Sequence, residues 1–176
     1  MSGIPFNMGP KEPEVHRSGG YGPEVLHLAL ERWGGVLSEC SDVSLAPDIP
    51  KRKLRKALRA YGSPHASEED IILLIDNTML RSAKDGLLLT SSHLLARSGI
   101  GGELVIPLQE INSIVPDIRK NLKFSIVGLV VNDSHFVALP GMGKKVKSLD
   151  QPAVFVLVAM LHEGLKLKVS VVDDVE

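Results

Sequence analysis

The chain begins with two segments whose apolar residues recur at helical spacing. The first has Pro23 where a helix would begin and Gly34 and Gly35 where it would stop, and the second stops at Gly62. We therefore predict helices over residues 23–33 and 51–61, with turns over residues 36–49. The apolar stripes are Val25, Leu26, Ala29, Leu30 and Trp33 in the first helix, and Leu54, Ala57, Leu58 and Tyr61 in the second.

From residue 71 onward the pattern changes to short apolar segments separated by turn residues. Asp85 and Gly86 form a dipeptide typical of tight hairpin turns, and residues 124–131 have the strongest strand pattern. Short strands at this spacing indicate an antiparallel barrel or sandwich rather than βαβ units. The predicted strands cover residues 71–75, 87–89, 93–96, 103–108, 111–115, 124–131 and 135–139.

The last long apolar run, residues 153–163, is rich in β-branched residues but has the length and the punctuated ends of a buried helix. Residues 165–172 alternate apolar and polar side chains and predict an edge strand. The predicted fold class is therefore α+β. It consists of an antiparallel half-barrel of about seven strands, capped by a C-terminal helix and preceded by N-terminal helices.

Three regions follow from these patterns. Residues 1–22 contain proline or glycine at every few positions and predict a flexible arm. Residues 23–50 form an N-terminal helical extension, and residues 51–176 form the barrel domain. Only 4% of the residues are aromatic, so the core must be built mainly from Leu, Ile and Val.

Charge is distributed unevenly along the chain. Residues 51–61 contain six bases and no acid, and since the net charge is −1, the remaining residues sum to −7. The single cysteine, Cys40, excludes a disulfide within the chain and a multi-cysteine metal site. The chain has no apolar leader, and its longest apolar run is too short to span a membrane, so we expect a cytoplasmic protein.

Several segments resemble a family of bacterial pleckstrin-homology-like (PH-like) domains, which are mostly uncharacterised proteins. The matching segments are Ile75-Asp76-Asn77-Thr78, Ser82-Ala83-Lys84-Asp85-Gly86, Leu88-Leu89-Thr90 and Ile106-Pro107-Leu108-Gln109-Glu110-Ile111. The resemblance covers residues 51–165 and implies a PH-like barrel that works as an interaction or lipid-facing module. It also agrees with a structural role in turns for Asp76, Thr78, Asp85 and Gly86.

The glycine loop at residues 140–147 is the best candidate site. It is not a nucleotide-binding P-loop, because Ala138 replaces the first glycine and Lys145 stands where Ser or Thr is required. The loop is either a solvated turn or an anion-binding loop, and the basic helix allows the same two interpretations. The candidate anion-binding residues are Lys144, Lys145, Lys147, Lys51, Arg52 and Arg55.

Other chemistry is not indicated by the sequence. His93 and His135 lie in predicted strands and could meet across the sheet, but no histidine, serine or cysteine has the spacing of a catalytic or metal site. We therefore predict no catalytic residues, no metal and no cofactor. Tyr61 is the only aromatic residue near the basic helix, which disfavours nucleic acid as a partner.

The function predicted from the sequence is a non-catalytic interaction module that acts by protein–protein contact with an unknown partner. The alternatives are binding of anionic lipid head groups or phosphate, with an anionic membrane surface as the partner, and an enzyme of unrecognised type. Pairing of the edge strand at residues 165–172 between two copies would give a homodimer.

Overall fold

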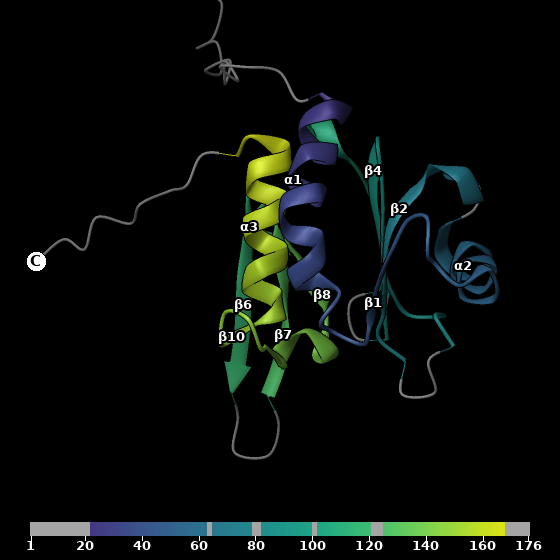
Figure 1. Ribbon diagram of the computed structural model, residues 1–176. Helices are drawn as coiled ribbons and strands as arrows, with labels where there is room; N and C mark the ends of the chain where they lie inside the picture. Colours follow the sequence, from purple (N-terminus) through teal and green to yellow (C-terminus); the bar gives the residue numbers. More distant parts are fainter. Residues whose placement is uncertain (1–21, 63–64, 79–81, 100–101, 121–124, 168–176) are drawn as a thin grey trace, which may run out of the picture.

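The computed structural model describes residues 22–62, 65–78, 82–99, 102–120 and 125–167 (Figure 1). The predicted arm lies outside this part of the chain except for Gly22. The strand predicted over residues 165–172 is wrong at its start, because Leu165 is the last residue of a helix and Lys166 is left-handed with φ of 51°. Residues 168–172 lie outside the described part.

The first sheet is antiparallel and has the strand order β1-β2-β3-β4-β5. Its strands are β1 (Val43–Leu45), β2 (Ile71–Asp76), β3 (Gly86–Thr90), β4 (His93–Ser98) and β5 (Gly102–Pro107). The helices α1 (Pro23–Leu37) and α2 (Lys51–Ala57) precede its main strands, and a π-helical turn (Leu58–Gly62) follows α2. β1 was missed in the sequence, because its three residues are too few for a periodic pattern.

The second sheet is also antiparallel and contains β6 (Ile114–Lys120), β7 (Ser125–Val131) and β8 (His135–Ala138) in that order. A short pair follows, β9 (Lys145–Val146) and β10 (Gln151–Pro152), and then α3 (Ala153–Leu165). The α+β class, the antiparallel sheets and the C-terminal helix are therefore confirmed. Short 3₁₀ turns lie at Glu68–Asp70, Leu108–Glu110 and Pro140–Gly143.

The strand predicted over residues 111–115 begins only at Ile114, after a 3₁₀ turn, and two further boundaries differ from the sequence prediction for physical reasons. β6 continues past Pro116, where we expected it to stop, because it is an edge strand and an edge position tolerates a residue without an N–H group. α1 continues through Gly34 and Gly35 to Leu37, which is fully buried. A Cβ atom at Gly34 would lie 2.9 Å from Leu45 Cδ1, so this glycine allows the helix to approach the first strand closely.

The five-stranded sheet has apolar packing on both faces. On one face, Leu74, Leu88 and Leu95 form a core with α2 and the π-helical turn. On the other face, a larger core joins the sheet to α1, α3 and the inner side of the second sheet. Figure 1 shows α1 and α3 side by side, and α2 separated from them by the five-stranded sheet. Residues 23–50 therefore belong to the same core as the strands, through α1 and β1.

His93 and His135 lie in different sheets, which corrects the sequence expectation that they could meet across one sheet. His93 lies in β4 of the first sheet, where its Nδ1 is 2.8 Å from Ser92 Oγ and its ring is 6.5 Å from the ring of His65. His135 lies in β8 of the second sheet, and its side chain is exposed. The two residues share no sheet because the chain turns into its second sheet after β5.

Candidate functional site: the α2 surface

The α2 helix is held on the sheet by one apolar stripe. Leu54, Ala57, Leu58 and Tyr61 are buried against β2, β3 and β4. The absence of a side chain at Gly62 allows this close packing, because a Cβ atom there would lie 2.7 Å from Leu58 Cδ2 and 3.1 Å from Leu88 Cδ1. Because the apolar stripe faces the sheet, the bases other than Lys53 lie on the outer side of the helix and of the turn that follows it.

The outer side of α2 and of the π-helical turn carries a groove of about 490 Å³ whose described lining residues are all bases. We call it the basic groove, and its lining residues are Lys51, Arg52, Arg55, Lys56 and Arg59. Arg55 Nε donates to Glu68 Oε1 at 2.9 Å. Within the described residues, the other four bases have no carboxylate in ion-pair contact. Four positive charges on this side therefore form no ion pair with the part of the chain that the structure describes.

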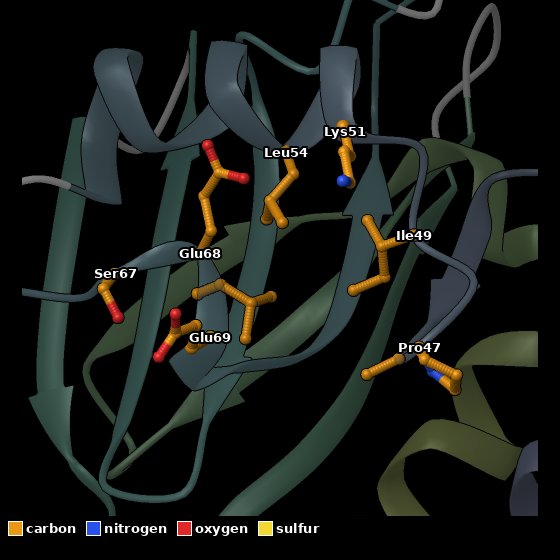
Figure 2. Close-up of a pocket in the computed structure, with 9 residues that line it drawn as sticks. Pro47, Ile49, Lys51, Leu54, Ser67, Glu68 and Glu69 are labelled. Carbon is orange, nitrogen blue, oxygen red and sulfur yellow. The ribbon is translucent and has the colours of Figure 1, made fainter.

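A second cavity of about 680 Å³ adjoins this groove, between residues 46–54 and residues 67–71 (Figure 2). We call it the amphipathic cleft. Its floor contains the buried side chains of Ile49, Leu54 and Ile71. Figure 2 shows Lys51 on one side of the cleft and Glu68 and Glu69 on the other. The cleft can therefore accept an apolar group, with opposite charges available along its two rims.

The lysines of the glycine loop have a different environment. Lys144 Nζ lies 3.3 Å from Asp42 Oδ2, and Lys145 Nζ lies 2.8 Å from Asp150 Oδ1. Hydrogen bonds from Ser148 and the charge of Lys147 hold the pKa of Glu39 below its usual value. The loop lies near the start of α3, across the molecule from α2 (Figure 1). The structure thus groups Lys51, Arg52 and Arg55 but places Lys144, Lys145 and Lys147 elsewhere, beside acids.

The residues expected in turns surround one buried carboxylate, Asp76, which is 2% exposed. Its Oδ1 accepts hydrogen bonds from Thr78 N at 3.1 Å, Thr78 Oγ1 at 2.6 Å and Ala83 N at 3.1 Å. Its Oδ2 lies 3.0 Å from Lys53 Nζ on α2. Asp76 therefore connects the loop after β2 to the inner side of α2, and this removes Lys53 from the basic groove.

Asp85 and Gly86 are not the centre of a tight two-residue turn, contrary to the sequence prediction. Asp76 pairs with Gly86 in the β2–β3 register, so the connection consists of residues 77–85. Asp85 O accepts a hydrogen bond from Asn77 N at 3.0 Å, and Asp85 Oδ1 is 3.5 Å from Arg97 Nε. Gly86 itself is a strand residue with φ of +150°, a conformation that side-chain-bearing residues rarely adopt.

The pH dependence of stability should report the environment of Asp76. Burial alone would raise the pKa of this carboxyl, but hydrogen bonds from Thr78 and Lys53 outweigh it and hold the pKa below the usual 3.8. A carboxyl with a lower pKa in the folded state adds stability above its unfolded pKa and loses that contribution as the pH falls through the folded pKa.

We therefore expect the stability difference between the wild type and Asp76→Asn to be largest at neutral pH and to shrink below about pH 4. Urea unfolding of both proteins across a series of pH values measures this difference. A difference that stays constant from neutral to acidic pH would contradict the assigned role of the Asp76 carboxylate.

Comparison with models of protein families, with curated proteins and with solved structures gave no match. Cys40 is buried with Sγ 3.8 Å from Gly141 O, and the described residues contain no group of three or more His, Cys, Asp or Glu side chains that could hold a metal ion. None of the described helices is both long and apolar enough to cross a membrane.

The sequence indicated part of the α2 surface and missed the rest. The run of bases in residues 51–59 was visible as the strongest charge block of the chain. The amphipathic cleft was not visible, because it depends on Glu68 and Glu69 folding back beside α2. The two acids were the sequence signal that could have indicated the cleft, because they closely follow the basic helix along the chain.

Proposed function

We propose that this protein is a non-catalytic interaction module with a PH-like half-barrel, and that it binds an acidic protein partner at the α2 surface. Two antiparallel sheets followed by a C-terminal helix are compatible with such a barrel. The resemblance of residues 51–165 to PH-like domains supports the same assignment. The α2 surface comprises the basic groove and the amphipathic cleft.

The observation that carries this proposal is the adjacency of the two cavities on one helix. Protein interfaces commonly combine an apolar centre that excludes water with a charged rim that orients the partner. The amphipathic cleft offers the apolar floor, and the basic groove offers four bases that form no ion pair with a carboxylate of the described residues. Because the rest of the chain sums to −7, an acidic partner would be repelled from most of the molecule and directed towards α2.

Charge reversal on the outer side of α2 should abolish partner binding. In the triple variant Arg52→Glu/Lys56→Glu/Arg59→Glu, each altered side chain points away from the apolar stripe, so the fold should be retained. A second variant, Ala46→Arg, fills the cleft from an exposed position. We expect quantitative affinity capture to lose the same acidic protein, by about tenfold or more, with either variant.

The matched control is Lys144→Ser/Lys145→Ser/Lys147→Ser, which removes three bases that lie beside acids elsewhere. We expect this control to capture the partner as well as the wild type does. Circular dichroism would verify the folding of all variants. Capture that depends on the loop lysines, or on neither surface, would contradict the proposal.

A second candidate function is binding of an anionic membrane surface, which the basic groove favours because it presents five bases on one side of the molecule. The apolar stripe of α2 is buried, so such binding would be electrostatic and would weaken with salt. Co-sedimentation with phosphatidylglycerol vesicles, compared with phosphatidylcholine vesicles, separates the two functions. Salt-sensitive binding to the anionic vesicles that is lost in the α2 triple variant would favour the membrane.

A further inference from the structure

The amphipathic cleft has one acidic rim, formed by Glu68 and Glu69 on the side opposite Lys51 (Figure 2). Glu68 Oε1 already accepts a hydrogen bond from Arg55 Nε at 2.9 Å, whereas Glu69 forms no ion pair with the described residues. An acid beside the basic groove repels an acidic partner locally, unless the partner places a base at that point. Glu69 is therefore suited to select among acidic partners.

The acidic rim is held in place by hydrogen bonds within its own turn. The 3₁₀ turn Glu68–Asp70 carries Glu69, and Ser67 N and Ser67 Oγ both donate to Asp70 Oδ2, at 2.8 and 2.7 Å. These bonds hold the pKa of the Asp70 carboxyl below its usual value. β2 begins directly after the turn at Ile71, whose buried side chain lies in the floor of the cleft. The acidic rim and the apolar floor are therefore positioned before a partner binds.

Lys51 connects the two cavities of the α2 surface, because it lines both the basic groove and the cleft. Across the surface, the bases of α2 come first, followed by Lys51, the apolar floor and then Glu69. A segment that complements this surface presents acids, one apolar side chain and one base in the same order.

We propose that the partner binds the α2 surface through a segment in which an acidic block, one apolar anchor residue and one basic residue follow each other along the chain. The acidic block lies along the basic groove, the anchor enters the cleft, and the base faces Glu69. This inference rests on the proposed function, because it specifies the partner of the same surface.

Fluorescence anisotropy with labelled peptides and the full chain tests this proposal. Each peptide has a block of four glutamates, a leucine and a last position that is either lysine or glutamate, and each is made in both chain directions. We expect the wild type to bind the lysine peptide of one direction about threefold more tightly than its glutamate counterpart, as is typical of an exposed ion pair. Attraction to the bases alone would favour the glutamate peptide, which carries more negative charge. Replacing the leucine of the peptide by serine should weaken binding about tenfold.

Glu69→Lys should invert the preference, so that the glutamate peptide binds more tightly than the lysine peptide. Partial unfolding of the variant would weaken both peptides and would not exchange their order. The matched control is Glu31→Lys, which makes the same charge change at an exposed residue of α1 outside both cavities. It should keep the preference of the wild type.

The possible failures of this proposal and of the proposed function can be told apart. Peptide binding that survives Arg52→Glu/Lys56→Glu/Arg59→Glu would overturn both. Absence of peptide binding, together with capture of an acidic protein that still depends on α2, would overturn only the proposed segment. The same would follow if the wild type and Glu69→Lys ranked the two peptides alike. Peptide binding that weakens as the protein concentration rises would assign the surface to a second copy of the chain, and would also overturn the proposal.

Discussion

Replacing Gly86 by alanine is expected to unfold the protein or to destabilise it by about 4 kcal/mol or more. The added Cβ atom would overlap the carbonyl oxygen of Ile75, which belongs to the adjacent strand β2. The backbone cannot relax easily, because Gly86 pairs with Asp76 on one side and with Arg97 on the other. Its φ of +150° adds strain for any residue with a side chain. Urea unfolding monitored by circular dichroism measures the loss.

Gly35→Ala is the matched control, because nothing lies within 4 Å of a Cβ atom at Gly35 and its backbone is helical. Alanine favours the helical state over glycine by roughly 0.5–1 kcal/mol, so this variant should be slightly more stable than the wild type. A Gly86→Ala protein as stable as Gly35→Ala would show that the contact between β2 and β3 tolerates a side chain at residue 86.

The second large effect is expected from Asp76→Ala, which should lower the free energy of unfolding by about 3 kcal/mol. The substitution removes the acceptor of three hydrogen bonds and leaves Lys53, whose side chain is only 21% exposed, without its anion. Buried donors that lose their acceptor retain their desolvation cost, which is why the loss exceeds that of an ordinary hydrogen bond.

Lys53→Met provides the comparison for Asp76→Ala. Methionine keeps the unbranched apolar stem of the lysine and removes only its charge, and the hydrogen bonds of Asp76 within the loop remain. Asp76 Oδ2 loses its cation in a side chain that is 1% exposed, but the three hydrogen bonds to Oδ1 remain, so we expect a smaller loss of about 2 kcal/mol in the same urea titration. A loss as large as that of Asp76→Ala would show that the ion pair, rather than the loop hydrogen bonds, is the main contribution of Asp76.

The sequence predicted the elements whose patterns are long and periodic. The prediction found the three α-helices and most strands of both larger sheets, because each of these elements buries a regular apolar face in one of the two cores. The failures have local causes. β1 has only three residues, and β6 continues past Pro116 because no other strand in the described ranges pairs at that edge. A pattern read along one chain gives no information about which strand lies at an edge.

The candidate site was predictable in its charge but not in its shape. The bases of α2 were evident as a block, and their outward orientation followed from the apolar stripe. The inward turn of Lys53 could not be predicted, because it depends on Asp76 lying at the end of a strand that crosses beneath the helix. The acids beside the loop lysines were equally hidden, since Lys144 meets Asp42 across 102 residues of sequence.

The apolar packing on both faces of the five-stranded sheet limits how the α2 surface can be studied. Deleting residues 51–62 would uncover Leu74, Leu88 and Leu95, which are fully buried in the intact protein. A truncated protein would then bind other molecules through these leucines or aggregate, and its behaviour would say nothing about the bases. Because α2 also covers one face of the sheet, its proposed role in binding can be separated from its role in stability only by substitutions on its outer side.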